Sequence, residues 1–510
     1  MAVSRSIKLF FLILCVSVSN TGRTVAAGDP PLRLTLKEAI RMAVEKNLEV
    51  RAELYNAAIG EADIRKNLGI YDPLLSLYAN YQEATTLPVS TFLSGTSLSR
   101  QKNLYANAGI SQRFPIGGQV GLYFNNTWNR NNSDSSAGFL NDYWQSQLTV
   151  SYSQPILKNF GREATELGIL VAVNNKNVSI EQFRTKLLDV VSRVRTAYFT
   201  LQGLKENLEA KKSALNLALK ILEDTKGRVK AGVLPAMEIL NAQYGVVSRE
   251  KERIDAEKDY RDQMDVVRRL LKAEENLELD PVDLPIRDEY AVDEFQAIKR
   301  ALQDRPEVKA QKIALQTADL QTRVAYNRVM PDLTFNASAA LTGLGQDYPR
   351  NLDRLGTGKY PIWGVGLQLT YPLGNRDAEN DFIKSRFKGE QARLQLANLE
   401  DAIKDEVKRA IRGIRARFLQ LDVADRRLAY AEERMRAYVK KNEVGLATTK
   451  EVVDVENDLV AAKTNQIRAR ADYAIAIGDF WKATGELLER EGVALTVIRD
   501  ADTLYDVNSR

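Results

Sequence analysis

The chain has 510 residues, of which 44% are hydrophobic and 27% charged, and its formal net charge is +5. A chain of this length usually forms two or three domains. The near balance of 72 Lys and Arg against 67 Asp and Glu argues against a nucleic-acid partner. With no His and a single Cys, the sequence excludes disulfide frameworks, CxxC metal sites and His-based acid–base catalysis.

The N-terminus is typical of an exported protein. Arg5 and Lys8 precede an apolar run over 9–18, and the polar stretch that follows ends in Val25-Ala26-Ala27. A basic start, a short apolar run and small residues before a cleavage point define a secretory signal peptide. We therefore predict a signal peptide over residues 1–27. The alternative is a short membrane anchor, which needs about twice this apolar length.

The remainder of the chain carries an internal duplication. A shift of 258 positions aligns 38–79 with 296–337 without a gap, and Pro73 falls on Pro331. Such self-similarity predicts two copies of one structural unit, here a helix, strands and a long helical hairpin. The predicted divisions are residues 1–27 (signal peptide), 28–280 (first repeat), 281–488 (second repeat) and 489–510 (C-terminal tail).

Heptad spacing predicts unusually long helices in both repeats. Apolar residues recur every seven positions in each half, a pattern that indicates coiled-coil packing between helices. The expected seams are Leu187, Val194, Leu201, Leu208, Leu215 and Leu222, then Val407, Ile414, Leu421, Leu428 and Met435. A helix over about 162–230 would be roughly 100 Å long. We expect its return arm over about 235–272.

Between the helices lie segments of alternating apolar and polar residues. The expected strands cover about 75–82, 144–152, 333–342 and 363–371. Alternation over about ten residues is the signature of a transmembrane β-barrel, although a half-buried sheet in a soluble protein alternates too. Aromatic residues at strand ends favour the barrel. Since four strands cannot close a barrel and lipid forbids open edges, several copies must share one.

The first repeat contains an additional pattern over about 103–129. Leu104 to Ile110 alternate, Phe114 to Gly118 form a turn, and Val120 to Trp128 alternate again. This predicts an extra β-hairpin in the first repeat alone. The sequence does not decide whether the hairpin extends the barrel or lies outside it.

Taken together, these features resemble the TolC-type outer-membrane efflux family over about 34–488. The resemblance rests on the segment 34–47, Pro73 and Pro331 before the strands, Gln154-Pro155 and Tyr371-Pro372 after them, the paired glycines Gly232 and Gly445, and the segment 483–487. It implies a mainly α protein with a transmembrane β-barrel, in which coiled-coil hairpins form an α-barrel. It also implies a homotrimer that shares a 12-strand β-barrel.

The resemblance further implies a passive duct in the outer membrane, with a large periplasmic part, that exports small molecules. The partners would be a periplasmic adaptor (membrane fusion) protein, an inner-membrane pump and outer-membrane lipid. No cofactor is expected, and no nucleophile–base constellation suggests an enzyme. A protein-secretion duct of the same fold and a periplasmic coiled-coil adaptor are the alternatives, and the exported substrate is not readable.

Glu451 and Asp454 are the candidate gate residues. In the family, acidic residues shortly after the second tip glycine line the narrow periplasmic end. On a helix, positions three apart share a face, so threefold symmetry would stack two carboxylate rings. The alternative is an ordinary helix start, where acids interact favourably with the helix dipole. Ala447 stands where well-known family members have a basic residue, which leaves the lock of the closed end unidentified.

The two hairpin tips are the candidate docking site for the adaptor. Each tip has a glycine followed by an apolar residue, Gly232-Val233 in the first repeat and Gly445-Leu446 in the second. Glycine permits the left-handed turn that ends a helix. A plain hairpin turn explains the glycines equally well, so the docking role depends on the exposure of Val233 and Leu446.

Overall fold

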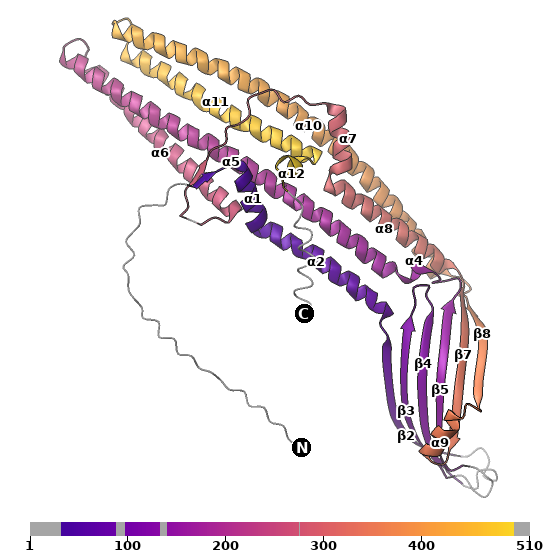
Figure 1. Ribbon diagram of the computed structural model, residues 1–510. Helices are drawn as coiled ribbons and strands as arrows, with labels where there is room; N and C mark the ends of the chain where they lie inside the picture. Colours follow the sequence, from indigo (N-terminus) through magenta and orange to yellow (C-terminus); the bar gives the residue numbers. More distant parts are fainter. Residues whose placement is uncertain (1–31, 88–96, 133–139, 275, 494–510) are drawn as a thin grey trace, which may run out of the picture.

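The computed structural model describes residues 32–87, 97–132, 140–274 and 276–493. The predicted signal peptide and all but the first residues of the predicted tail lie outside these ranges. The molecule is elongated: a β-sheet lies at one end and two helical hairpins reach the other (Figure 1). Over the described part of the chain, no helix combines the length and apolar composition needed to span a membrane.

The two repeats use the same order of long elements. The first contains β1 (Leu32–Leu34), α1 (Leu36–Lys46), α2 (Leu48–Leu68), η1 (Gly69–Tyr71), β2 (Leu74–Thr86), β3 (Ser99–Arg113), β4 (Gln119–Asn131), β5 (Asp142–Pro155), α4 (Arg162–Thr165), α5 (Leu167–Lys230) and α6 (Met237–Leu271). β6 (Leu279–Pro281) spans the predicted boundary between the repeats. After it come α7 (Glu294–Asp304), α8 (Pro306–Val329), β7 (Asp332–Gly345), α9 (Tyr348–Gly356), β8 (Pro361–Thr370), α10 (Arg376–Glu443), α11 (Thr449–Thr484) and α12 (Leu487–Arg490), the last of which extends past the predicted end of the second repeat. The repeat boundaries themselves stay a prediction.

Local capping explains where the paired short helices begin. Thr35 starts α1 with a capping box in which Glu38 returns the hydrogen bond. Asp293 caps α7 through the N–H groups of Phe295 and Gln296. Such side-chain acceptors satisfy backbone donors that a helix start would otherwise leave unpaired. The parallel pair β1–β6 brings the starts of the two repeats together.

The long helices confirm the heptad prediction. The helix α5 has 64 residues and α10 has 68, so each is about 100 Å long. Leu187, Val194, Leu201 and Leu208 are buried in the first repeat. Val407, Ile414, Leu421 and Met435 are buried in the second, while Leu428 of the expected seam is only half-buried. Towards the first tip, smaller side chains fill the buried face of α5. Ala214, Ala218 and Thr225 are buried there in place of the expected leucines.

The four expected strands are present as β2, β5, β7 and β8, and the predicted extra hairpin is present as β3 and β4. The expected count of four strands per chain is wrong, because the hairpin joins the same sheet and the described residues form six strands in the order β2-β3-β4-β5-β7-β8. All neighbouring strands are antiparallel. The extra hairpin, β3 and β4, lies inside this sheet between β2 and β5, since β3 pairs with β2 and β4 pairs with β5 along almost their full lengths. The edge strands β2 and β8 are exposed.

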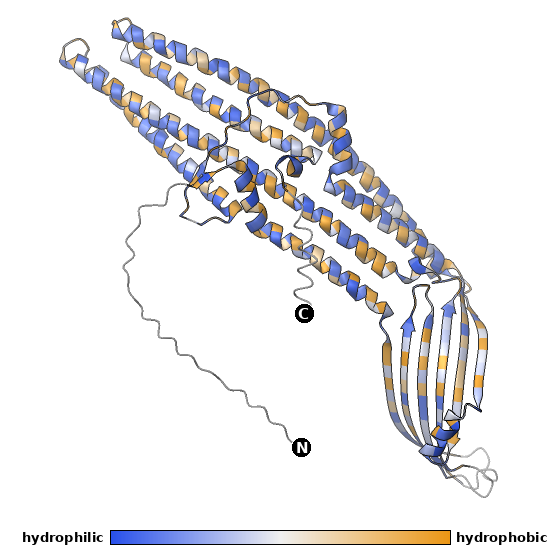
Figure 2. Ribbon diagram, in the orientation of Figure 1, coloured by the Kyte–Doolittle hydropathy of each residue, from blue (hydrophilic) through white to orange (hydrophobic). Residues whose placement is uncertain are grey.

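The sheet has one apolar and one polar face. One line of paired residues across all six strands is apolar: Leu77, Ala108, Phe124, Leu148, Leu341 and Pro361. A neighbouring line, on the opposite face, contains Tyr78, Asn107, Asn125, Gln147 and Thr342. Figure 2 shows the alternating colours along these strands. This is the pattern of a wall with lipid on one side and water on the other.

The short helix α9 covers two polar residues of the apolar face. Asn126 and Ser146 lie on that face, buried beneath Asn351 of α9. The Ser146 N–H donates to Asn351 Oδ1 at 3.1 Å, and the Ser146 hydroxyl donates to Asn126 Oδ1 at 2.5 Å. Gly343 permits the approach, since a Cβ there would lie 2.2 Å from the Asn351 carbonyl oxygen. The helix thus seals a polar cluster away from the surface.

Candidate functional site

Both hairpin tips end in the same hydrogen-bonded turn. The N–H of Val233 donates to the carbonyl of Arg228 at 2.9 Å, and that of Leu446 donates to the carbonyl of Lys441 at 2.8 Å. The preceding glycines, Gly232 and Gly445, have φ of +74° and +78°. These are Schellman motifs, in which a left-handed glycine closes the end of a helix. The predicted turns are confirmed at both positions.

The apolar residues after the glycines point away from the molecule. Val233 is 70% exposed and Leu446 is 78% exposed. No heavy atom lies within 4 Å of a Cβ built on either glycine, so the tips have open space around them. Two exposed apolar residues at the ends of neighbouring hairpins satisfy the geometric condition for docking. The docking role itself stays a prediction.

Arg228 links the two tips, a contact that the sequence analysis missed. Its Nη1 donates to the carbonyl of Asn442 at 2.9 Å, across from α5 to α10. The side chain of Asn442 donates to the carbonyl of Ala447 at 2.9 Å. One bond joins the hairpins and the other braces the second turn. The turn at Ala447 is therefore held by an amide rather than by a charged side chain.

The structure places Glu451 in the N-terminal turn of α11, where it caps the helix. The N–H of Thr448 donates to Glu451 Oε2 at 2.8 Å, and the N–H of Glu451 donates to Thr448 Oγ1 at 3.2 Å. The hydrogen bond from the Thr448 backbone lowers the pKa of Glu451. This capping box supports the helix-start interpretation. Because the carboxylate stays exposed and ionised, it remains available to a pore as well.

Asp454 lies one turn further along α11 and is exposed. Residues three apart on a helix lie on one side, so Asp454 follows Glu451 along the same face. The neighbouring acid Asp458 differs, because Arg434 of α10 pairs with it at 2.7 Å. The structure thus brings Glu451 and Asp454 together near the second tip. Their role as a gate stays a prediction.

A buried ionic cluster joins the two hairpins further from the tips. Arg249 of α6 is 3% exposed and lies 3.5 Å from Glu456 of α11, which is 1% exposed. Arg249 also bonds to Asn457 and, at 2.8 Å, to Glu252. Burial raises the pKa of Glu456, and the Arg249 charge opposes that rise. The cluster therefore joins α6 to α11 through buried polar contacts.

An exposed apolar stripe runs along α10 on the side opposite its buried face. The sequence spacing of its members matches whole helical turns, so they lie on one face of the helix. They are Ile383, Phe387, Leu394, Leu419, Val423 and Tyr430. Leu394 is 72% exposed and Tyr430 is 74% exposed. Since α10 continues from β8, helix and strand form one continuous border of the molecule, which we call the α10 edge (Figure 1).

A matching border lies on the other side of the molecule. Near the tips α6 carries exposed apolar residues, namely Met237, Leu240, Tyr244, Val247 and Ile254. Nearer the sheet α2 carries Leu48, Tyr55 and Ile59, again exposed. Because α2 runs into β2, these elements form a second continuous border, the α6–α2 edge (Figure 1). Both helices bury their opposite sides against α5, so these apolar residues face outward.

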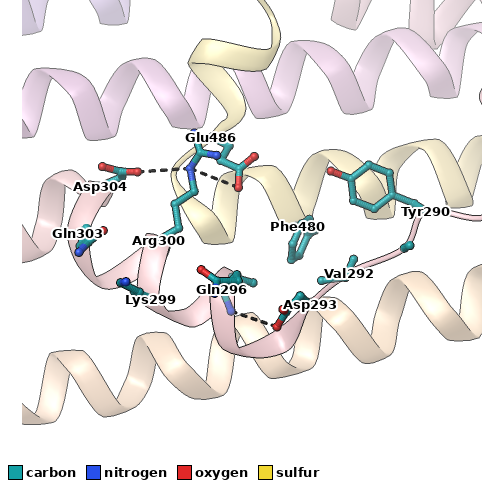
Figure 3. Close-up of a pocket in the computed structure, with 12 residues that line it drawn as sticks. Tyr290, Val292, Asp293, Gln296, Lys299, Arg300, Gln303, Asp304, Phe480 and Glu486 are labelled. Atoms are coloured by element: carbon teal, nitrogen blue, oxygen red, sulfur yellow. Dashed lines mark hydrogen bonds and ion pairs between the residues drawn. The ribbon is translucent and has the colours of Figure 1, made fainter.

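A hollow lies between α7 and the junction of α11 with α12 (Figure 3). It encloses about 520 Å³ and is lined by both apolar and charged residues. Arg300 pairs there with Asp304 at 3.4 Å and with Glu486 at 3.5 Å. The first pair lies within α7, and the second ties α7 to the junction of α11 with α12. Within the described ranges no group of three or more acidic residues is placed to hold a metal ion.

The sequence pattern of the outer membrane efflux protein family matches residues 94–271 and 297–486 of this chain. Among curated proteins, the outer membrane efflux protein BepC of Brucella suis is 25% identical over 194 residues. The match covers 38% of this chain and 41% of BepC, so the chain spans about two fifths of that relative.

Two solved structures share the fold over nearly the whole chain. The CmeC outer membrane channel of Campylobacter jejuni superposes with a TM-score of 0.65 at 15% identity, covering 93% of this chain and 90% of its own. VceC, an outer membrane protein of Vibrio cholerae, superposes with a TM-score of 0.63 at 15% identity, covering 88% and 96%. The arrangement of long paired helices that continue from a sheet is therefore the fold of known outer-membrane channels.

Proposed function

Since the chain belongs to the outer membrane efflux protein family, we propose that its copies close side by side into a duct that passes small molecules outward from a periplasmic pump. Family membership places the protein in the outer membrane. The sheet supplies the membrane-embedded wall, with its apolar face towards lipid. The long helices extend the same wall by roughly 100 Å into the periplasm.

The observation that supports this proposal is that the α10 edge and the α6–α2 edge both lack a packing partner within the described structure. Each edge combines an unpaired strand with helices whose exposed apolar stripes lie opposite their buried faces. In lipid an unpaired strand edge is prohibitive, so β8 must pair with β2 of another copy. The stripe on α10 then meets α6 and α2 of that copy. Contact between unlike edges closes into a ring.

We take the ring to contain three copies, the number that the family resemblance implies. The antiparallel order supports closure, because β2 and β8 run in opposite directions along the sheet. Such a trimer has its hairpin tips at the periplasmic end. There Val233 and Leu446 are exposed towards a periplasmic adaptor, and three copies of Glu451 and Asp454 surround the axis as a gate.

The chemistry required of such a duct is modest. A passive pore needs width, a hydrated wall and charged groups where it narrows. The polar face of the sheet supplies the hydrated wall, and the acidic residues near the second tip supply the charge. Energy for transport then comes from the pump at the inner membrane, which the duct only continues.

Complementation tests the proposal. The chain is expressed with its own adaptor and pump in a Gram-negative strain that lacks an efflux duct, and tolerance to toxic small molecules is measured. We expect tolerance to rise only when all three proteins are present. Unchanged tolerance, with the protein correctly inserted in the outer membrane, would contradict the efflux role. Export of an unfolded protein substrate in that same strain would favour a secretion duct instead.

A further inference from the structure

We propose that the membrane wall of this duct contains eighteen strands, six from each copy, and that its wide, uncharged bore does not select the cargo. Selection by size and charge then falls to the hairpin tips. The inference rests on the three-copy ring of the proposed function. It starts from the hairpin β3–β4, which places six strands in each chain where four were expected.

The hairpin is a full member of the sheet. β3 pairs with β2 from Leu74↔Ser111 to Thr86↔Ser99, along the whole of β2. β4 pairs with β5 along almost its full length as well, up to Arg130↔Asp142. A hairpin that lay outside the barrel would leave β2 and β5 paired with each other. In this structure β2 and β5 are separated by two strands, so a wall that closes through them must include the hairpin.

The turn of the hairpin is fixed at the helix-side end of the sheet. The carbonyl of Ile116 accepts hydrogen bonds from the Gly161 N–H at 3.3 Å and from Gln154 Nε2 at 3.0 Å. Gly117, with φ of +91°, lies so close that a Cβ would be 2.8 Å from the Asn159 carbonyl oxygen. The turn is therefore docked against the junction of β5 with the helices.

Both faces of the hairpin continue the faces of the sheet. Ala108 and Phe124 lie in the apolar line, and Asn107 and Asn125 lie in the polar line. A register slip of one residue would reverse this assignment for a whole strand. The agreement on both faces means that the hairpin contributes lipid-facing and water-facing surface like its neighbours.

The added strands widen the wall considerably. With strands about 4.8 Å apart and tilted by about 40°, an eighteen-strand barrel is about 36 Å across its backbone, and a twelve-strand barrel about 24 Å. Side chains occupy about 5 Å on each side, which leaves free bores of about 26 Å and 14 Å. The wider value matches barrels that enclose an aqueous channel rather than a filled interior.

The bore of this barrel is polar but almost without charge. On the polar face of the described strands, the only charged residues are Arg113 and Asp332, both at the helix-side end. Tyr123 lies flat along this wall, because its ring covers Gly109 and Gly121, where a Cβ would lie within 2.6 Å of it. An almost uncharged wall does not attract ions of one sign, and the flat Tyr123 ring does not narrow the bore.

The helices are compatible with the additional strands. β3 begins and β4 ends at the end of the sheet that is remote from the helices, so the hairpin adds no helix to the junction. Each copy still joins its sheet to α2, α5, α8 and α10. Removing 99–132 would leave 87–98 and 133–141 as a connection from β2 to β5. The four remaining strands would keep their antiparallel order.

The experiment compares the full chain with this deletion by labelling a cysteine in the bore. Both carry Cys15→Ser and Asn336→Cys, which places a thiol on the polar face of β7. The reagents, added from outside the cell, are a small maleimide and a maleimide-bearing dendrimer about 20 Å across, a size between the two bores. Arg350→Cys on the exposed surface of α9 is the control site.

In the full chain we expect the dendrimer to label Asn336→Cys at nearly the rate of the control site. In the deletion variant its rate should fall by about tenfold or more, while the small maleimide reacts as before. No dendrimer labelling of the full chain, or equal labelling of both variants, would overturn the proposal. Control-site labelling verifies that each variant reaches the cell surface.

A density map of the detergent-extracted full chain keeps the proposal testable if the deletion variant does not assemble. A closed ring of eighteen strands supports it, and a ring with the hairpins outside the wall overturns it. The density map also distinguishes failure of the eighteen-strand wall from failure of the proposed duct. A ring with another strand count, in a strain where efflux is restored, contradicts the bore alone. Absence of any ring contradicts the duct itself.

Discussion

The two repeats agree in their helices and differ in their strands. α1 and α7 each have 11 residues, and α5 and α10 have 64 and 68. Yet the first repeat carries four strands of the main sheet and the second carries two. The helical wall depends on heptad contacts that a duplication copies unchanged. An inserted hairpin adds two strands to a sheet and returns the chain to the end of the sheet at which the insertion began. The connections to the helices therefore stay where they were.

The second repeat shows a different elaboration at the same end of the sheet. α9 connects β7 to β8 and covers Asn126 and Ser146, which belong to the first repeat. The polar cluster under α9 therefore couples the inserted hairpin to the opposite repeat. The helices are thus alike in the two repeats, while the strands and their connections differ.

The largest effect is expected from breaking the α10 edge, which the α6–α2 edge of the next copy covers in the proposed ring. Leu394→Asp together with Tyr430→Asp places two charges where apolar contact is required. Buried unpaired charges are strongly unfavourable, so the closed oligomer should be lost. The molar mass of the detergent-extracted complex, measured by light scattering, checks this result.

Ala429→Asp is the matched control for the edge, since Ala429 is exposed but lies to the side of the stripe. This variant should assemble like the unchanged chain. If the double variant retains the full oligomer mass, the stripe on α10 is not an interface between copies.

A smaller effect distinguishes the two tips. Valine at Gly445 or Gly232 must adopt a left-handed backbone, which costs about 1–2 kcal/mol and is least tolerated by a β-branched residue. We expect Gly445→Val to impair adaptor binding while the oligomer remains intact. Binding of the purified adaptor to each variant measures the effect, and comparison with Gly232→Val shows which tip docks.

Gly413→Val serves as the reference for the tips, because Gly413 lies within α10 and has open space around its Cα. It carries the same change without a left-handed backbone. Unaltered adaptor binding by both tip variants would argue that the turns only reverse the chain.

The smallest effect concerns aligned acids of the two repeats, Glu49 and Glu307. Hydrogen bonds from Arg193 and then Lys186 lower the pKa of Glu49 to about 2. The folded pKa is below the unfolded one, so the stabilisation is present above about pH 4.5 and is lost as the pH falls towards 2. Glu49→Gln should lower the free energy of unfolding by less than about 1 kcal/mol at pH 7, because the carboxylate is nearly half exposed.

Thermal unfolding of Glu49→Gln at pH 7 and near pH 2 checks both the size and the direction. Glu307→Gln is the comparison, since its partner Arg305 keeps a second ion pair with Glu406 at 2.6 Å. We expect the loss to be smaller there. A Glu49→Gln defect that persists unchanged near pH 2 would show that the ion pairs are not its cause.

Much of this architecture was predictable because it repeats. The heptads around Leu201 and Ile414, the strands and the tip glycines each follow from spacing alone. The position of the hairpin was not predictable, since alternation reveals a strand's faces but not its neighbours. The Arg228–Asn442 bond was not predictable, because it depends on which atoms the tertiary structure brings together. The capping box of Thr448 with Glu451 is local and has a sequence signature, Thr followed three residues later by Glu, so it could have been found from the sequence.

The central claim is that charge selection lies at the periplasmic tips and not in the membrane wall. The most direct test is the reversal potential of the purified duct in planar bilayers under a salt gradient. The double variant Glu451→Gln with Asp454→Asn removes the charges, and glutamine preserves the capping box with Thr448. Conductance alone is not diagnostic, because loss of mutual repulsion also tightens closure. The account predicts a cation-selective duct whose selectivity weakens in the variant. An unchanged reversal potential would contradict it and leave both acids as ordinary helix-start residues.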